Sequence, residues 1–291
     1  MNKQKAALVI AIIAAIFSVG IILYPLIGTF YNARHQSTVH SQYMETVAEI
    51  ENQEIRKLRK RAREYNDLIR GGAKELGSFD MDALRRAQNG YKGQLNLLGD
   101  GVMGYIEIPK IGVQLPIFHG TDDHTLQLGA GHLLGTSLPV GGRGSHCVLT
   151  AHSGMAANRM FSDLPALEEG DLFILNTLGR ELGYRVDQIK VTLPEETEAL
   201  RIEREKDLCT LVTCTPFGVN THRLLVRGSR IPDEELKRAQ QETEQLELRS
   251  EIRHSVWESE YLKGIAIGIG IVLLAVLVIW SVQMIRKYSK R

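Results

Sequence analysis

The stretch Asp207-Leu-Cys-Thr-Leu-Val-Thr-Cys-Thr-Pro-Phe-Gly-Val-Asn-Thr-His-Arg-Leu-Leu-Val-Arg227 contains two short runs of strand-forming residues with a turn between them. The first run, Leu208 to Thr213, ends at Cys214 and is followed by a Pro-Phe-Gly turn signal. The second run, Leu224 to Arg227, begins directly after Arg223. So short a connection favours a β-hairpin, which would bring Cys214 and Arg223 side by side.

Further runs of this kind fill the region beyond Gly101, and turn residues separate them. Most prolines of this region fall between or at the ends of the runs, where a missing backbone donor does least harm, and Pro116 lies within Val113–Phe118. Several short strands at this spacing predict a barrel or a sandwich. The additional predicted strands are Val102–Ile108, Val113–Phe118, His146–Thr150, Leu172–Asn176 and Tyr184–Val191.

Helical patterns flank the β-rich region. From Tyr43 to Ile69, apolar residues recur every three or four positions, which predicts an amphipathic helix that ends at Gly71-Gly72. A second helix is expected from Asp80 to about Gln88. The charged segment Glu234 to Glu260 is compatible with a helical, solvated spacer.

The composition excludes several classes of protein. A chain of 291 residues allows one or two domains, and 44% hydrophobic with 24% charged residues is too apolar for a disordered chain and too mixed for a polytopic transporter. Residues 1–30 and 261–291 hold seven basic and no acidic residues. The remainder has 28 basic against 34 acidic residues, a net charge of minus six, so no basic field for nucleic acid is present.

Two apolar segments lie near the ends of the chain. Ala6 to Ile27 would span about 33 Å as a helix, enough for a bilayer core of about 30 Å, and Gly264 to Ile285 is a second uncharged span. Basic residues precede the first segment and follow the second, which predicts two membrane passes with both termini in the cytoplasm and residues 31–260 outside. A cleavable signal peptide is the alternative for the first segment, although its apolar region is usually shorter.

Three residue types that can act together in acyl transfer fall at predicted strand ends. Cys214 closes one run, Arg223 opens the next, and His152 follows the run His146–Thr150 and precedes Gly154. A thiolate is the effective nucleophile, an imidazolium lowers the thiol pKa and protonates a leaving amine, and a guanidinium stabilises an oxyanion.

Each of these residues also has an ordinary structural interpretation. Taken alone, Cys214 could be a small buried hydrophobe, His152 a hydrogen-bonded structural histidine and Arg223 a member of a surface ion pair. Cys147 and Cys209 are better interpreted as packed thiols than as a disulfide pair, although the sequence alone leaves a disulfide between them open. No His/Cys/Asp cluster has metal-ligand spacing, so neither a metal nor another cofactor is expected.

Thr210-Leu-Val-Thr-Cys214, with Thr221-His-Arg223 nine residues on, resembles the catalytic signature of the sortase family. Two further stretches are similar to that family, Gly104-Tyr-Ile-Glu-Ile-Pro-Lys-Ile111 and Gly129-Ala-Gly-His-Leu-Leu-Gly-Thr-Ser-Leu-Pro139. The presence of a second apolar span is similar to class C, the pilus-assembling sortases of Gram-positive bacteria, which often carry one. The resemblance covers about Val102 to Arg230.

This resemblance implies a mainly β fold: an eight-stranded sortase-type barrel with N-terminal helices, flanked by two transmembrane helices. Cys214 would cleave a Leu-Pro-x-Thr-Gly-like sorting signal of a pilin or surface protein between Thr and Gly, and a pilin lysine amine would resolve the thioester. His152 would act as general acid and base, Arg223 as the oxyanion clamp and Thr213 as a substrate-groove contact.

The predicted organisation has five parts. They are a cytoplasmic tip and anchor (1–30), an extracellular helical segment (31–100), the catalytic barrel (101–231), a charged spacer (232–263) and a second transmembrane helix with a basic cytoplasmic tail (264–291). Many class C relatives carry an Asp-Pro-aromatic lid motif before the barrel. No Asp-Pro occurs between Tyr65 and Gly101, and the nearest candidate is Phe79-Asp-Met-Asp82, so a lid is not expected.

Three alternative functions stay open at the level of sequence. A wall-anchoring sortase would use a cell-wall precursor amine in place of a pilin lysine. A secreted cysteine peptidase would release free acid regardless of any added amine. A membrane-tethered binding protein that merely keeps the barrel would be indifferent to loss of the Cys214 thiol.

Overall fold

The computed structural model describes residues 39–72, 90–153 and 159–247, together with residues 13–15, 17, 18, 20, 21, 28, 263, 264 and 266–271. The chain divides into two compact units, and the larger one spans residues 32–155 and 159–253. Within the described parts, no helix is both long and apolar enough to cross a membrane. Most of the two predicted spans, Ala6–Ile27 and Gly264–Ile285, lie outside the described residues.

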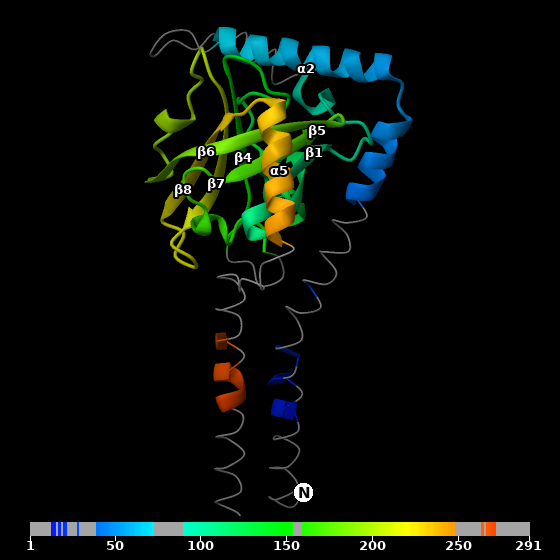
Figure 1. Ribbon diagram of the computed structural model, residues 1–291. Helices are drawn as coiled ribbons and strands as arrows, with labels where there is room; N and C mark the ends of the chain where they lie inside the picture. The colour runs from blue at the N-terminus through cyan, green and yellow to red at the C-terminus, as the bar shows by residue number, and fades with distance from the viewer. Residues whose placement is uncertain are drawn as a thin grey trace, which may run out of the picture. The chain divides into compact units, whose positions relative to one another are not determined.

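The larger unit is built on a closed barrel of eight strands (Figure 1). Around the barrel the strands follow the order β1-β2-β3-β4-β7-β8-β6-β5. Pairs β2–β3 and β4–β7 are parallel and the other pairs are antiparallel. The strands are β1 (Val102–Ile108), β2 (Val113–His119), β3 (Ala130–His132), β4 (Ser145–Thr150), β5 (Leu172–Thr177), β6 (Arg180–Thr192), β7 (Asp207–Thr215) and β8 (His222–Arg230).

All seven strands expected from the sequence are present, and the eighth, β3, is the one that the residue pattern missed. Its three residues are flanked and interrupted by glycine, which carries no strand signal of its own. A Cβ atom on Gly131 would collide with the backbone carbonyl of Gly120, and one on Gly129 with that of Pro116. Glycine is required at these two positions because the backbone of Pro116 and Gly120 lies too close to leave room for a side chain.

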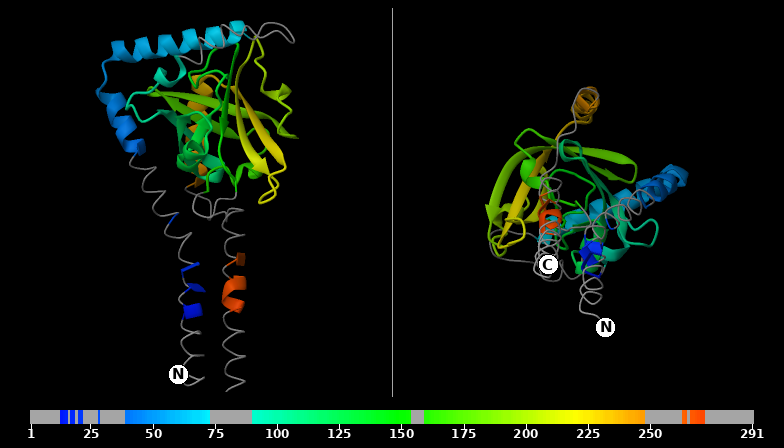
Figure 2. Two further views of the ribbon diagram at one scale, coloured as in Figure 1. Left: turned by 180° about the vertical axis from the view of Figure 1, so that it is seen from behind. Right: turned by 90° about the horizontal axis from the view of Figure 1, so that it is seen from below.

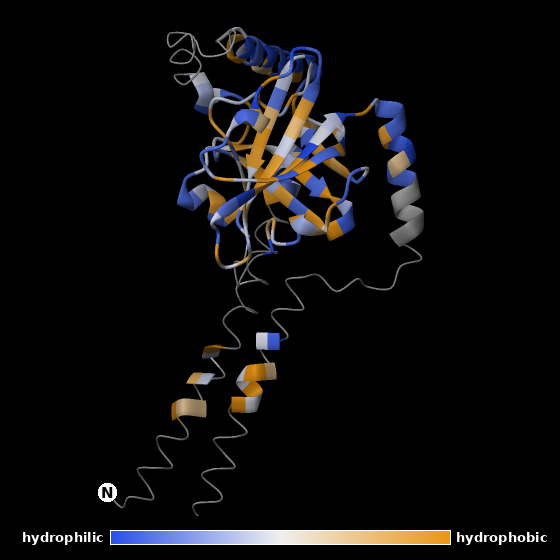
Figure 3. Ribbon diagram, turned by 90° about the vertical axis from the view of Figure 1, so that its left-hand side faces the viewer, coloured by the Kyte–Doolittle hydropathy of each residue, from blue (hydrophilic) through white to orange (hydrophobic). Residues whose placement is uncertain are grey.

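The barrel interior forms the main hydrophobic core. Apolar side chains from all eight strands contribute to it, and the large side chains of Phe173 and Tyr184 stack there with ring centroids 5.5 Å apart. Figure 3 shows hydrophobic residues concentrated on the strands, whereas the helix at the top of the view is largely hydrophilic. This core holds the strand ends, and hence the site residues, in fixed positions.

Helices cover parts of the barrel. Residues 39–49 are helical, a bend follows at Ile50, and α2 (Asn52–Gly72) then runs across one end of the barrel (Figures 1 and 2). The sequence predicted one uninterrupted helix from Tyr43 to Ile69, so that prediction missed the bend but located the end of the helix correctly. The helix predicted at Asp80–Gln88 lies outside the described residues.

Two further helices complete the larger unit. The short α4 (Asp123–Leu128) is capped by Asp122, whose side chain accepts a hydrogen bond from Thr125 N. The C-terminal α5 (Asp233–Glu247) starts directly after the barrel, and its Leu236 packs on Ile174 and Ile231. The first half of the predicted spacer is therefore a helix that is docked on the barrel.

Candidate active site

Cys214 lies at the end of β7, directly opposite Arg223 at the start of β8. The two residues are cross-strand partners in the antiparallel β7–β8 pair, as the short connection predicted. In the turn between the strands, Asn220 takes a positive φ of 62°, a conformation that asparagine tolerates better than most residues. The hairpin thus places a thiol and a guanidinium on neighbouring strands.

His152 reaches the same region through the parallel pairing of β4 with β7. Thr150 is the Cα partner of Val212, and Ala151 N donates a hydrogen bond of 3.2 Å to Val212 O. His152 follows immediately, so the chain carries its ring past the end of β4 toward the end of β7. Parallel strands that end together leave both side chains at one rim of the barrel.

Two hydrogen bonds fix the chain on either side of His152 to the chain around Cys214. Thr213 Oγ1 donates to Ala151 O at 2.8 Å, and Ser153 Oγ donates to Cys214 O at 2.7 Å. Because Ala151 and Ser153 flank the histidine, these contacts hold the β4 and β7 ends in register. Sequence reasoning did not single out Ser153, and its only signal is its place next to His152.

Cys214, His152 and Arg223 line one cavity of about 470 Å³. Its walls are mostly apolar, and threonine hydroxyls and the Glu196 carboxylate add polar groups. A mostly apolar pocket beside a thiol suits a peptide segment with aliphatic side chains. The other lining residues are Thr121, Leu126, Leu133, Val148, Thr150, Ala151, Thr192, Leu193, Pro194, Thr197, Leu200, Val212 and Leu225.

Arg223 is held by backbone carbonyls. Its Nη1 donates to Asn220 O at 3.1 Å and to His222 O at 3.0 Å, both in or next to the β7–β8 turn. Arg223 forms no ion pair with any residue in the described part of the chain. The alternative interpretation of this arginine as half of a surface ion pair therefore has no support there, and the guanidinium keeps donors for a bound substrate.

Thr213 occupies a different place from the groove position expected for it. Its side chain is only 1% exposed and is not among the residues that line the cavity. Its hydroxyl instead donates to Ala151 O. Thr213 thus contacts the chain next to His152 from inside the barrel wall.

The remaining histidine and cysteines of interest are in the core. His132 is fully buried, with Nδ1 2.8 Å from Tyr91 Oη and Nε2 2.9 Å from Ser137 O, so it is a hydrogen-bonded histidine of the core. Cys147 and Cys209 are Cα partners on β4 and β7, and both are buried free thiols. Burial, and then the neighbouring Cys147, raise the pKa of Cys209 well above its ordinary value.

Two other sequence predictions concern metal ions and the lid. Among the described residues, no group of three or more His, Cys, Asp or Glu side chains is arranged to hold a metal ion. The lid candidate Phe79-Asp-Met-Asp82 lies outside the described residues.

Residues 106–231 match the sortase domain family. Among characterised proteins, the chain is similar to sortase D of Bacillus subtilis, with 31% identity over 131 residues that make up 44% of this chain and 63% of that protein. It is also similar to sortase A of Bacillus anthracis, with 25% identity over 232 residues, 79% of this chain and 97% of that protein.

Solved structures give matches of higher sequence identity. Sortase C1 of Streptococcus agalactiae is 40% identical, with a TM-score of 0.62, over 67% of this chain and 99% of that chain. Sortase C of Clostridium perfringens, solved with the C-terminal cell wall sorting motif, is 41% identical, with a TM-score of 0.57 and the same coverage. Sortase C of Streptococcus pneumoniae is 38% identical, with a TM-score of 0.59, over 67% of this chain and 97% of that chain.

These matches and the barrel define the class of protein as a cysteine transpeptidase. The chain belongs to the sortase family, and its structural neighbours are class C, pilus-related members of that family.

Proposed function

We propose that this protein is a membrane-anchored pilin polymerase that cleaves a Leu-Pro-x-Thr-Gly-like sorting signal and joins the new carboxyl end to a lysine amine of another pilin. The observation that carries the proposal is the single cavity lined by Cys214, His152 and Arg223. Two class C relatives support the choice of substrate: the Clostridium perfringens enzyme was solved with a C-terminal cell wall sorting motif, and the Streptococcus pneumoniae structure bears on pilin substrate specificity.

In the first half-reaction, the Cys214 thiolate attacks the threonine carbonyl carbon, and a carbon–sulfur bond forms. The resulting oxyanion is stabilised by Arg223, whose guanidinium is positioned by hydrogen bonds to the carbonyls of Asn220 and His222. As the carbon–nitrogen bond breaks, His152 gives its proton to the leaving glycine amine. The product is a thioester between Cys214 and the threonine.

In the second half-reaction, the lysine amine attacks the thioester carbonyl and loses a proton to His152. The carbon–sulfur bond breaks, Cys214 returns to the thiolate, and an isopeptide bond joins the two pilins. Thr213 and Ser153 act as positioning residues, because their hydrogen bonds fix the chain segments that carry His152 and Cys214. The apolar lining, including Leu126 and Leu200, receives the Leu-Pro part of the signal.

We further propose that the chain crosses the membrane twice, through Ala6–Ile27 and Gly264–Ile285, with residues 31–260 outside the cell. The basic residues at both ends of the sequence support this orientation. A tethered enzyme of this kind would meet secreted pilins as they emerge from the membrane.

The full-length protein is to be incubated with a Leu-Pro-x-Thr-Gly peptide, with and without a pilin-derived lysine peptide, and analysed by mass spectrometry. We expect an acyl adduct on Cys214 that lysine converts to an isopeptide product. Arg223→Lys keeps the charge but loses the planar fork, and should slow adduct formation about 10- to 100-fold. Product formation with a cell-wall precursor amine but not with lysine would favour the wall-anchoring alternative, and release of free acid alone would indicate a peptidase.

A further inference from the structure

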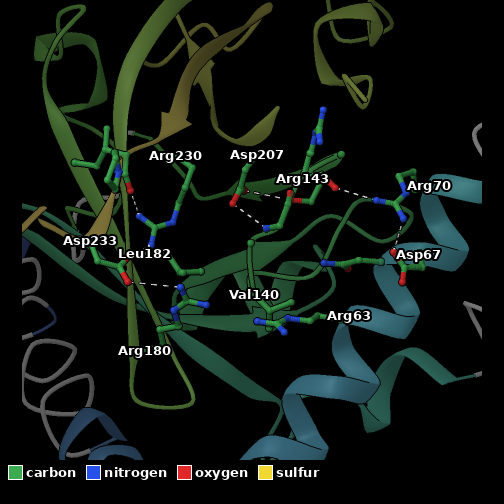
Figure 4. Close-up of a pocket in the computed structure, with 17 residues that line it drawn as sticks. Arg63, Asp67, Arg70, Val140, Arg143, Arg180, Leu182, Asp207, Arg230 and Asp233 are labelled. Atoms are coloured by element: carbon green, nitrogen blue, oxygen red, sulfur yellow. Dashed lines mark hydrogen bonds and ion pairs between the residues drawn. The ribbon is translucent and has the colours of Figure 1, made fainter. Parts of the chain in front are cut away.

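A second cavity, of about 520 Å³, lies at the opposite end of the strands from Cys214. Figure 4 shows the side chains that line this second cavity. It is bordered by the first residues of β4, β6 and β7, the last residue of β8, the glycine-rich segment 140–144 and α2. Asp207 lies at this end of β7 and Cys214 lies near the other end. At the rise of a β-strand, the seven positions between these two residues correspond to roughly 23 Å. We call the second cavity the arginine cavity, after Arg63, Arg70, Arg143, Arg180 and Arg230.

Three carboxylates also line the arginine cavity, and the most buried of them, Asp207, forms no ion pair with an arginine among the described residues, although the charge of Arg230 acts on it. Asp207 accepts hydrogen bonds from Gly142 N at 2.8 Å, Tyr184 Oη at 3.0 Å and Ser145 Oγ at 3.2 Å. Backbone and hydroxyl donors thus occupy its oxygens. Among the described residues, Asp67 and Asp233 are the carboxylates of the cavity that form ion pairs with its guanidinium groups.

These two carboxylates pair with three of the arginines. Asp67 lies 2.7 Å from Arg70, and Asp233 lies 2.5 Å from Arg230 and 3.6 Å from Arg180. Arg143 pairs with Glu205 outside the cavity, where both side chains are largely exposed. An exposed pair of this kind contributes little to binding energy.

Arg63 has no ion-pair partner among the residues that the structure describes. It lies four residues after Arg59 on α2, so the two side chains share one face of the helix. Burial, and then the nearby charges of Arg180 and Arg63, lower the pKa of Arg59. Arg59, which does not line the cavity, thus senses the charges of the two lining residues Arg63 and Arg180, and an anion in the cavity would offset this accumulation of positive charge.

We propose that the arginine cavity binds the phosphate group of a phosphate monoester or diester. The planar guanidinium fork matches phosphate oxygens, and a phosphate can accept from guanidinium groups on α2 and β6 together, whereas a carboxylate suits a single fork. The volume of the cavity exceeds that of an isolated phosphate, which leaves room for the ester group. This proposal does not depend on the proposed function.

The test uses the full-length protein and isothermal titration with inorganic phosphate, pyrophosphate, glycerol phosphate and acetate. Arg63→Gln/Arg180→Gln should weaken binding of the phosphate probes at least 10-fold. The matched control, Lys57→Gln/Lys60→Gln, removes two charges from exposed positions of the same helix and should change the affinity less than 2-fold. Arg63→Gln alone serves if the double variant melts at a markedly lower temperature.

A second arm separates the possible sources of the phosphate. Vesicles of phosphatidylcholine with and without phosphatidylglycerol are compared with the soluble probes. Binding of soluble phosphate esters assigns the cavity to a free or polymer-borne phosphate. Binding only to the vesicles that contain phosphatidylglycerol assigns it to a lipid headgroup, provided that Arg63→Gln/Arg180→Gln abolishes the preference for these vesicles.

Three results would overturn the proposal: neither a soluble phosphate probe nor the anionic vesicles bind, acetate binds as well as the phosphate probes, or the control variant loses as much affinity as the cavity variant. Peptide cleavage is measured in parallel. It should be unchanged in Arg63→Gln/Arg180→Gln, because Cys214 lies at the other end of β7. Failure of phosphate binding with cleavage intact would therefore leave the proposed function standing.

Discussion

The two ends of strand β7 carry the same reactive residue type in opposite settings. Cys209 lies in the barrel interior with no exposed surface, opposite Cys147 on β4. Cys214, five residues further along, is partly exposed, lines the cavity of His152 and is paired with Arg223. An odd separation on a strand sends side chains to opposite faces, so one thiol is packed and the other is available for chemistry. Position on the strand, and not residue type, separates the two roles.

The largest expected effect tests this difference through activity. Cys214→Ala should lower thioester and product formation at least about 10³-fold, because it removes the nucleophile. Cys209→Ala should stay within about 3-fold of the unsubstituted protein, because Cys209 does not reach the cavity. Both are measured by peptide cleavage and mass spectrometry. Equal losses in the two variants would show that the thiols cannot be separated by position.

Alkylation of the native protein provides the next test. Iodoacetamide should modify Cys214 more than about 100-fold faster than Cys147 or Cys209, since buried thiols react only after local opening. Peptide mapping after timed quenching gives the three rates. The same measurement in urea should equalise them, and early labelling of Cys209 in native protein would contradict a packed interior.

Stability should respond in the reverse order. Cys209→Ala leaves a small cavity in the core and should cost about 1 kcal/mol, whereas Cys214→Ala should change the free energy of unfolding by less than about 0.5 kcal/mol. Urea unfolding followed by fluorescence measures both. A larger cost for Cys214 would mean that its side chain contributes to packing.

The smallest effect concerns pH at the first residue of β7. Burial raises the pKa of Asp207, so the folded state binds this proton more tightly than the unfolded chain. The resulting stabilisation of the folded state is fully present below the pKa that Asp207 has in the unfolded chain, and it is lost as the pH rises through the pKa of Asp207 in the folded state. The melting temperature of Asp207→Asn should therefore vary less across this window.

Asp233→Asn is the matched control for Asp207, because both residues line the arginine cavity. A hydrogen bond from Arg230 lowers the pKa of Asp233, so its contribution has the opposite sign and is lost as pH falls. If both variants change the pH profile in the same direction, the assigned burial of Asp207 is wrong.

Much of the barrel and the approach of Cys214 to Arg223 were predictable from local patterns. Alternating apolar runs identify strands, and a short turn forces the flanking residues together. The strand β3 and the bend at Ile50 were not predictable in the same way. The first depends on close backbone approach at Gly131, and the second interrupts a helical periodicity that continues on both sides of it.

The candidate site divides along the same line. Local signals singled out His152, Cys214 and Arg223, but nothing in the spacing of Thr213 and Ser153 predicts that their hydroxyls join the ends of β4 and β7. The arginine cavity likewise has no local motif, since its five arginines come from α2, the segment 140–144, β6 and β8.

By itself, the sequence determined the strand-rich fold, the hairpin and the three reactive residue types, because these depend on neighbours within a few positions of the chain. Only the tertiary structure decided which threonine supports the histidine and where the arginines gather. Those outcomes depend on barrel closure, which brings together residues that are far apart in the chain and that no local pattern relates.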